Sequence, residues 1–500
     1  MAHLTSERDR VTVAIIGSGL GGLACAVRLQ QRGITDVVVL ERSDGIGGTW
    51  WDTRFPGAEV DVTSELYSFS FMPWTFSRTH AGHVELREYV ARVAERFGLR
   101  RSVRLRTAVR EVRWLEEADE YELTLATGGT LRARHVVSAV GMLTEPRTPD
   151  LVGSGSFGGR VFHTSRWPAD ASFSGRRVAV VGTGSTSAQI VPELARESAQ
   201  LLVFQRQPGW VLPKPDRDYE APDLARLNRP GVRRWRRWTA FRSLEKVKSA
   251  AETGSKQNLA VERVARAYLE SAVSDPIVRS ALTPDYPFSG KRTVLSQYYL
   301  PTFNRDDVTL VPHAVQRLEP GAVVDASGER WSVDDIVLAT GFKASEYLST
   351  LTVVGPGGRD LHEHWAGEPR AFLGMMVTGF PNFFIMYGPN TNGGSVLFTL
   401  ECQAQWIADS IRRAGPERVV LVRPGLESRL DTSIQRRNKQ MAWSQADNYF
   451  RSASGRVVTQ WPFTQTRYWF LSRLLRGRTA MTFRPAAVLD PSRTQAGVHE

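Results

Sequence analysis

The stretch VTVAIIGSGLGG, residues 11–22, decides the fold that the sequence predicts. It opens with a near-continuous apolar run, which is typical of a strand buried in a parallel sheet. Glycines follow at once, and residues 23–30 then carry apolar side chains at helical spacing, with Gly33 as a stop signal. A second apolar run, Val37 to Leu40, ends in Glu41. The pattern predicts a strand, a glycine turn, a helix and a second strand.

The spacing G-x-G-x-x-G at this turn predicts a dinucleotide site. Gly17 permits the tight turn, Gly19 lets the backbone approach a pyrophosphate, and Gly22 lets the helix pack closely on the strand. The helix N-terminus offers amide donors to the phosphates. Glu41 is placed to accept hydrogen bonds from both ribose hydroxyls, and a merely structural glycine turn would not explain this acid.

The same pattern of strand, glycine turn, helix and strand recurs further along the chain. Residues 177–181 read as a second buried strand, followed by GTGSTS at 182–187, a helix to about residue 196 and a strand at 201–204. Ser187 replaces the third glycine and is small enough to keep the helix close. In both units the charged residue after the second strand lies 24 positions beyond the first glycine (41 − 17 and 206 − 182). The equal spacing predicts two nucleotide-binding units.

The two charged residues differ chemically. The Glu41 carboxylate repels a 2′-phosphate and suits a free ribose, as in FAD. The Arg206 guanidinium attracts a 2′-phosphate, as in NADPH. We therefore expect FAD in the first unit and NADPH in the second. A solvated surface arginine is the alternative interpretation of Arg206, because the chain is rich in arginine.

The second unit interrupts the first. Strand patterns that end in glycine, at 136–141 and 336–341, are expected to close the domains around each nucleotide. The sequence thus predicts an α/β fold with two Rossmann-like dinucleotide-binding domains, the NADPH domain inserted in the FAD domain, and a helical subdomain. The predicted parts are the FAD domain, first part (1–148), the NADPH domain, first part (149–213), a helical insertion (214–288), the NADPH domain return (289–335), the FAD domain, second part (336–485), and a tail (486–500).

Composition excludes several other classes of protein. Of 500 residues, 42% are hydrophobic and 23% are charged, which fits a globular chain of several domains and not a disordered one. Two cysteines cannot build a disulfide framework or a four-thiolate metal site, and no metal site is expected. No apolar run is long enough to span a bilayer, and the N-terminus carries no signal-type run, so we expect a cytoplasmic location.

Charge raises an alternative of another class. The formal net charge is +12, and residues 233–238 read RRWRRW. A basic run with tryptophans is compatible with nucleic-acid binding. No basic stripe continues along the rest of the chain, so we expect a charged helix face whose tryptophans pack inward, and no nucleic-acid partner.

Residues 157–168 carry a specific family signature. Phe157, Gly159, His163, Trp167 and Pro168 match F-x-G-x3-H-x3-W-P, the fingerprint of type I Baeyer–Villiger monooxygenases, which the sequence resembles. Flavin-containing N- and S-monooxygenases have a related fingerprint. A histidine between two nucleotide units can hydrogen-bond to the backbone and couple the domains. GGTW at 47–50, FPG at 55–57, KR at 291–292 and GFPNFF at 379–384 also resemble this family.

The resemblance implies roles for particular residues. Arg292 would stabilise negative charge on the reacting substrate, and Asp61 would orient and balance it. Lys291 would join Arg206 on the 2′-phosphate, and Trp50 would lie against the flavin ring and exclude water. The cofactor residues that we predict are Gly17, Gly19, Leu20, Gly22, Glu41, Gly48, Thr49, Trp50, Asp61, Tyr67, Val109, Gly182, Thr183, Gly184, Ser185, Thr186, Ser187, Gln189, Arg206, Lys291 and Arg292.

The implied activity is oxidation of a small, apolar ketone to an ester or lactone with NADPH and O2. Oxygenation of an amine or a sulfide is the alternative, and the fingerprint ending Trp167-Pro168 together with the Asp61 and Arg292 pair favours the ketone. A disulfide reductase has the same two-unit layout but needs two cysteines beside the flavin. Cys25 and Cys402 lie far apart in the sequence and do not supply them.

Overall fold

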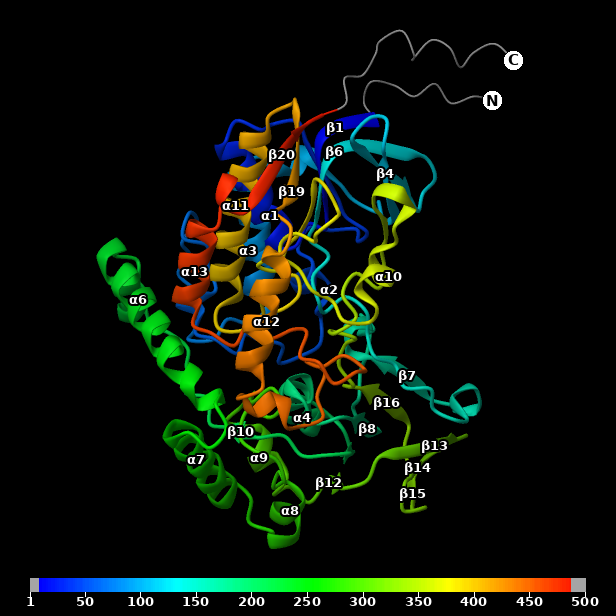
Figure 1. Cartoon of the computed structure of the whole chain (residues 1–500). Helices are drawn as coiled ribbons and strands as arrows, with labels where there is room; N and C mark the ends of the chain where they lie inside the picture. The colour runs from blue at the N-terminus through cyan, green and yellow to red at the C-terminus, as the bar shows by residue number, and fades with distance from the viewer. Residues whose placement is uncertain (1–8, 487–500) are drawn as a thin grey trace.

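Residues 9–486 are described by a computed structural model, which has two main sheets (Figure 1). The larger sheet has eight strands in the order β17-β4-β5-β6-β1-β2-β3, with β18 paired to β6. Its centre is parallel, and only β5 pairs antiparallel, with β4 and β6. The strands are β1 (Arg10–Ile16), β2 (Val37–Leu40), β3 (Val103–Arg104), β4 (Val109–Leu115), β5 (Glu120–Leu125), β6 (Thr130–Ser138), β17 (Thr352–Val354) and β18 (Phe383–Ile385).

The smaller main sheet has five parallel strands in the order β12-β9-β8-β16-β7. They are β7 (Arg160–His163), β8 (Arg177–Val181), β9 (Gln200–Phe204), β12 (Val308–Val311) and β16 (Asp335–Leu338). The chain leaves the larger sheet after β6, builds this sheet and returns at β17. The predicted α/β fold with one unit inserted in the other is therefore confirmed.

The predicted division between residues 335 and 336 is wrong. It falls inside β16, whose four residues pair in register with both β7 and β8. The strand therefore belongs to the second unit, and the chain crosses back to the first unit between β16 and β17.

Both glycine turns have the same backbone geometry. Gly17 (φ +105°) and Gly182 (φ +116°) lie in a region that favours glycine. A Cβ atom at Gly17 would lie 2.7 Å from the Ala139 carbonyl oxygen, and one at Gly182 would lie 2.5 Å from the Ala339 carbonyl oxygen. Each turn leads directly into a helix, α1 (Leu20–Gln31) or α4 (Ser185–Glu197). Because each glycine lacks a side chain, its turn can lie against the backbone that follows the neighbouring strand.

Helices from the two ends of the chain pack together beside the larger sheet. α1 packs against α11 (Val396–Ala414), and α11 packs against α13 (Gln465–Leu474). Figure 1 shows these helices gathered on one side of the molecule with α3 (His83–Arg96) and α12 (Leu426–Asn438). Their buried apolar faces form one continuous core with β1 and β6, so the C-terminal part of the chain completes the first domain.

Residues 214–288 are mainly helical, with α5 (Ala221–Leu227), α6 (Pro230–Val247), α7 (Lys256–Ala272) and α8 (Pro276–Ala281). Figure 1 shows α6 as a long green helix that stands out from the body of the protein. The short elements elsewhere are α2 (Thr49–Asp52), α9 (Tyr299–Thr302), α10 (Leu361–Trp365), β10 (Val211–Leu212), β11 (Val294–Leu295), β13 (Val315–Glu319), β14 (Ala322–Asp325), β15 (Arg330–Ser332), β19 (Arg418–Val422) and β20 (Met481–Pro485).

The expectation of inward-facing tryptophans on α6 is wrong. Trp235 and Trp238 are each 60% exposed. Arg237 lies on the inner face instead and donates to the Ser68 carbonyl oxygen at 2.6 Å, and Arg236 pairs with a carboxylate of the first domain at 2.8 Å. The arginines take this face because hydrogen-bond acceptors lie there, which leaves the indoles outside.

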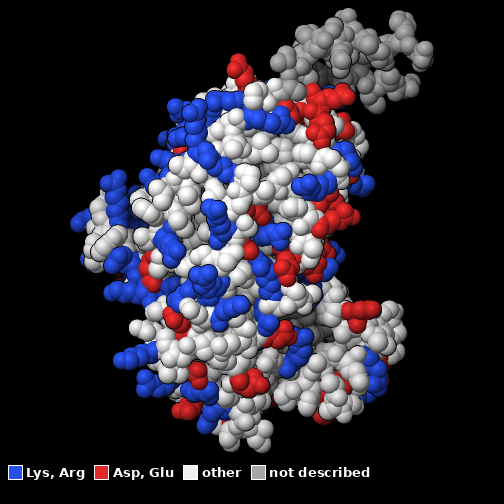
Figure 2. Space-filling view, viewed as in Figure 1, with Lys and Arg blue, Asp and Glu red and all other residues white. Residues whose placement is uncertain are grey.

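The face seen in Figure 2 is basic without forming a stripe. Figure 2 shows Lys and Arg side chains spread over the visible face among neutral and acidic ones, and dense along α6 at its edge. Within residues 9–486, no helix combines the length and the apolar character that crossing a bilayer requires.

Candidate active site

A cavity of about 1100 Å³ lies between the two glycine-turn units. Residues from both units and from the C-terminal part of the chain form its wall, so the fold brings distant segments to one site. The predicted residues that line it are Gly17, Gly19, Leu20, Glu41, Gly48, Thr49, Trp50, Asp61, Tyr67, Val109, Ser185, Thr186, Gln189, Lys291 and Arg292.

The other predicted cofactor residues lie behind the cavity wall or beside it, and they are Gly22, Gly182, Thr183, Gly184, Ser187 and Arg206. A Cβ atom at Gly22 would lie 1.9 Å from the Gly17 carbonyl oxygen, and Ser187 is fully buried. These two small residues let α1 and α4 approach their strands, so they act on the shape of each turn and not by contact with a ligand.

Each glycine turn leaves the start of a helix open to an anion. Gly19 and Gly184 are the N-caps of α1 and α4, and neither helix has a capping side chain or an acid in its first turn. Amides at such a start lack helical partners, and together with the helix dipole they favour phosphate. Both turns therefore fit the pyrophosphate of a dinucleotide.

Glu41 is held at the cavity wall of the first unit. It is buried, and its carboxylate accepts hydrogen bonds from the Ser18 amide at 2.7 Å and the Ser43 amide at 2.9 Å. These contacts fix the carboxylate where the ribose of a dinucleotide on α1 would lie. The residues of the first unit fit FAD.

Two cations lie together beside the second turn. Lys291 donates to the side-chain oxygen of Gln207, and the backbone carbonyl oxygen of Gln207 accepts from the Thr183 hydroxyl at 3.1 Å. Burial and the nearby Arg206 guanidinium lower the pKa of Lys291. Within the described part of the chain, no carboxylate forms an ion pair with either cation. The charges of Asp285 and Asp447 oppose the lowering of the Lys291 pKa but do not cancel it. Two neighbouring cations fit the 2′-phosphate of NADPH.

Arg292 and Asp61 form an ion pair on the wall of the same cavity. The Asp61 charge is the main cause of a raised pKa for Arg292, so the guanidinium is always protonated. Of the Arg292 side chain 46% is accessible, against 17% of Asp61. The arginine thus presents its free surface to the cavity while the aspartate holds it from behind.

Aromatic side chains surround this ion pair. The Trp50 indole donates to the Tyr67 hydroxyl at 3.0 Å, with the two rings nearly perpendicular. Burial raises the pKa of Tyr67 to about 12, and it raises the pKa of Tyr387 as well. The phenols therefore stay neutral. The wall near Arg292 consists largely of aromatic rings, whose polar atoms carry no charge.

The segment from Phe55 to Asp61 joins the two nucleotide units. The Gln189 side chain of α4 donates to the Glu59 carbonyl oxygen at 2.9 Å. Lys214 donates to the Val60 carbonyl oxygen at 2.8 Å. Asp61 is therefore positioned by contacts that come from the second unit.

The fingerprint residues lie behind the cavity wall. The His163 Nδ1 atom accepts from the Ser165 amide at 3.1 Å, and its Nε2 atom donates to the Gly341 carbonyl oxygen at 3.0 Å. Burial lowers the pKa of His163, so it stays neutral. The histidine thereby ties the end of β7 to the turn after β16, close to the crossing between the two sheets. Phe157 is buried, and a Cβ atom at Gly159 would lie 2.0 Å from a backbone oxygen of the segment before β16.

Sequence reasoning missed part of the cavity wall. Lys248, Tyr387, Asn392, Trp443 and Tyr449 line it and come from three distant segments. No local spacing marks these residues. The aromatic residues of segment 443–450 were the one available signal in the sequence.

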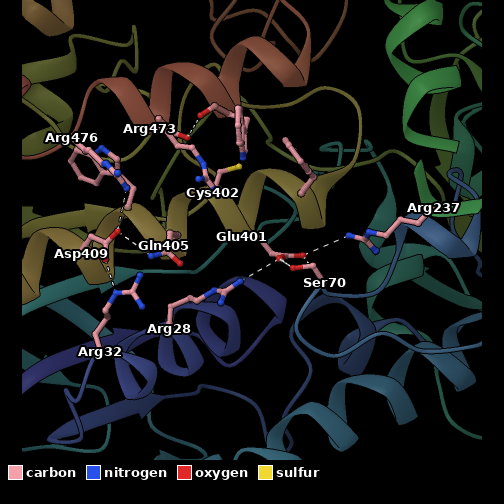
Figure 3. A pocket seen from close by; sticks show the side chains of 14 residues that line it. Arg28, Arg32, Ser70, Arg237, Glu401, Cys402, Gln405, Asp409, Arg473 and Arg476 are labelled. Atoms are coloured by element: carbon pink, nitrogen blue, oxygen red, sulfur yellow. Dashed lines mark hydrogen bonds and ion pairs between the residues drawn. The ribbon is translucent and has the colours of Figure 1, made fainter. Parts of the chain in front are cut away.

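A second cavity, of about 450 Å³, lies apart from this site (Figure 3). Figure 3 shows Glu401 of α11 between arginines that reach it from other helices. Glu401 accepts from the Ser70 amide at 2.7 Å and lies 3.4 Å from Arg28 of α1 and 3.6 Å from Arg237 of α6. These ion pairs join three helices, and none of the predicted cofactor residues lines this cavity.

A family model described as pyridine nucleotide-disulphide oxidoreductase matches residues 14–234. Burial raises the pKa of both Cys25 and Cys402 to about 12, and neither lines the large cavity. Residues 9–486 therefore hold no reactive cysteine pair beside the nucleotide units.

A relative from Streptomyces coelicolor named Baeyer-Villiger monooxygenase is 38% identical over 481 residues, which cover 94% of this chain and 92% of the relative. The chain belongs to the Baeyer–Villiger monooxygenase family. A relative from Pseudomonas aeruginosa with the same name is 34% identical, over 92% of this chain and 89% of the relative. The family expected from the fingerprint is confirmed.

Two solved monooxygenase structures have the same fold as this Baeyer–Villiger family member. A closed crystal structure of cyclohexanone monooxygenase matches with a TM-score of 0.88 and 27% identity, over 95% of this chain and 99% of that one. An oxidized steroid monooxygenase bound to NADP matches with a TM-score of 0.86 and 28% identity, over 96% of this chain and 100% of that one.

Proposed function

We propose that this protein is an FAD-containing monooxygenase that uses NADPH and O2 to convert a ketone into an ester or lactone. Each turnover consumes one ketone, one O2, one NADPH and one proton, and it forms the ester, NADP⁺ and water. The observation that carries the proposal is the Arg292–Asp61 pair on a cavity shared by two nucleotide cradles. Membership of the Baeyer–Villiger family supports the reaction type. FAD, when bound, accepts hydride from NADPH and activates dioxygen.

Arg292 supplies the fixed positive charge that this reaction needs. The carbonyl oxygen of a ketone gains negative charge when the carbonyl carbon is attacked, and a preorganised donor at that oxygen lowers the barrier by about 3–4 kcal/mol. Asp61 orients the guanidinium and balances its charge. Trp50 and Tyr67 keep water away from the reacting atoms.

The residues in and beside the wall of the large cavity also support the cofactor and substrate assignments. Glu41 takes the FAD ribose, and Arg206 with Lys291 takes the 2′-phosphate of NADPH. The aromatic lining near Arg292 suits the hydrocarbon part of a small ketone. The proposal keeps the cytoplasmic location that the sequence favours.

An Arg292→Ala variant tests the proposal. We expect NADPH to reduce the bound flavin at a near wild-type rate, and ester formation to fall at least about 100-fold, since one charge-stabilising donor is lost. Stopped-flow absorbance of the flavin measures the first step, and product quantification measures the second. Arg292→Lys should recover part of the ester formation, because it restores the charge without the planar fork.

Arg305→Ala is the matched control. Arg305 pairs with Asp307 on the surface, and its side chain is 47% accessible, close to the 46% of Arg292. This variant should behave like the wild type in both steps. Ester formation by Arg292→Ala at a near wild-type rate would remove the assigned role.

A further inference from the structure

Lys248 is a charged residue on the cavity wall to which the reaction assigns no role. It follows α6 and lines the same cavity as Arg292. Its Nζ atom donates to the Trp461 carbonyl oxygen at 2.6 Å and lies 4.9 Å from the ring centroid of Trp443. In the part of the chain that the structure describes, no carboxylate forms an ion pair with it.

The charged groups near Lys248 are engaged elsewhere. Glu245 accepts from the Gln465 amide at 2.7 Å and so holds the start of α13. Arg437 pairs with Glu252 at 2.7 Å. Burial lowers the pKa of Lys248 to about 8, with Glu245 opposing this shift and Arg437 adding to it. The amine is therefore mostly protonated at neutral pH, and an enclosed cation without a counter-ion is costly.

The wall between Lys248 and Arg292 is continuous. A Cβ atom at Gly393 would lie 3.2 Å from the Lys248 Nζ atom. The neighbouring Asn392 accepts from the Tyr387 hydroxyl at 2.9 Å, and Tyr387 lies within the electrostatic reach of Arg292. Both cations therefore face one space along this side.

Aromatic side chains line the same cavity beside both cations. Trp443 lies under Lys248, and Tyr449 lies against Arg292. Phe450 joins them, with its ring 4.6 Å from that of Tyr449, and it packs in one cluster with Trp443. Two cations, each with an aromatic neighbour, on the wall of one cavity suit a ligand with two polar groups and a hydrocarbon part.

We propose that Lys248 anchors a carboxylate of the substrate, so that the natural substrate is a keto acid whose ketone lies at Arg292. The inference rests on the proposed function and names its substrate class. An ammonium has three donors, and the Trp461 carbonyl oxygen takes one of them. The two that are left can donate to the two oxygens of a carboxylate, and the single positive charge balances its single negative charge, whereas a phosphate would call for more cations.

The test compares linear methyl ketones that end in a carboxylate, in its methyl ester or in a methyl group, at several chain lengths. With wild-type holoenzyme, kcat/KM for the best carboxylate should exceed that for its ester by about tenfold or more, the usual contribution of a charged hydrogen bond. Lys248→Met should remove this preference, so that kcat/KM for the acid falls to that for its ester. Lys248→Arg should keep most of it.

Lys246→Met is the matched control, because Lys246 is exposed two residues earlier and does not line the cavity. It should keep the wild-type preference. The preference of the wild type should also fade as the pH rises through about 8, since the amine then loses its charge. A preference that persists in Lys248→Met, or equal kcat/KM for acid and ester in the wild type, would overturn the inference.

A binding measurement separates this inference from the proposed function. Calorimetric titration of the FAD-loaded protein with the same acid and ester should show tighter binding of the acid by the wild type and by Lys248→Arg. Lys248→Met should bind the acid and the ester alike. If this holds while no ketone is oxygenated, the proposed reaction fails and the carboxylate anchor stands. If neutral ketones are oxygenated but acid and ester bind alike, the anchor fails and the reaction stands.

Discussion

At the residue scale, Arg206 is the residue that we propose selects NADPH over NADH. It is exposed beside Lys291 and forms no ion pair among residues 9–486, which leaves it available to a 2′-phosphate. Arg206→Ala should raise KM for NADPH about tenfold or more, the usual contribution of a charged hydrogen bond. KM for NADH, which lacks this phosphate, should change little. Initial rates of NADPH and NADH oxidation give both values.

Arg196→Ala serves as the control for that experiment. Arg196 lies at the far end of α4, where it pairs with Glu193 on the surface. Its loss should leave both cofactors unaffected. An equal rise in KM for NADPH and NADH in Arg206→Ala would remove the 2′-phosphate argument. No rise for either cofactor would show that this arginine is a solvated surface residue, the alternative that the sequence left open.

Site residues that belong to a local sequence motif could be predicted. Site residues that reach the cavity only through tertiary contacts could not. Gly17 and Gly182 were found because a strand, a turn and a helix are consecutive in the sequence, and both have the positive φ that the motif requires. Lys248 and Tyr387 join the cavity only when α6 and the segment before α11 fold against it. Periodicity and spacing carry no information on such contacts.

At the element scale, Asp335 holds the starts of three strands together. Its carboxylate is fully buried at the start of β16, and it accepts from Arg160 of β7 at 2.7 Å and from Arg176, just before β8, at 3.0 Å. Burial alone would raise the pKa of Asp335, but these hydrogen bonds lower it below its ordinary value. Asp335→Asn should lower the free energy of unfolding by about 2–3 kcal/mol, because two guanidinium groups lose their partner.

The pH dependence of this contribution has a definite sign. A carboxylate with a lowered pKa stabilises the fold above the ordinary pKa of an aspartate, and this stability is lost as the pH falls through the lowered value. Denaturant unfolding between neutral and acid pH should therefore show a smaller loss of stability for Asp335→Asn than for the wild type. Asp334→Asn, which removes an exposed pair with Arg177, should cost less than about 1 kcal/mol. Similar costs for the two variants would contradict the role of Asp335.

The assignment of a strand to a domain was predicted less well where the sheets of both domains could pair with it. The pattern of residues 336–341 marks a strand that ends in glycine, and either sheet could take such a strand. Only the pairing of β16 with β7 and β8 assigns it to the second unit. The face of α6 was also misjudged, because the acceptors that draw Arg236 and Arg237 inward come from segments far away in the sequence.

At the scale of the whole molecule, insertion of one nucleotide unit into the other creates the cavity. The first unit supplies Asp61 and Glu41, and the second unit with its return supplies Lys291 and Arg292. The order of the units along the chain was sufficient to predict this arrangement, since strands of each Rossmann-like unit must meet in one sheet. The C-terminal part of the wall was not predictable, because its residues have no regular spacing.

The most direct test of the account is turnover of a ketone under isotopically labelled dioxygen. Purified, FAD-loaded protein is supplied with NADPH and the ketone, and mass spectrometry follows the product. The account predicts an ester or lactone that carries one labelled oxygen atom for each NADPH consumed. NADPH consumption that yields only hydrogen peroxide with every ketone class tested, or purified protein that does not bind FAD, would contradict it.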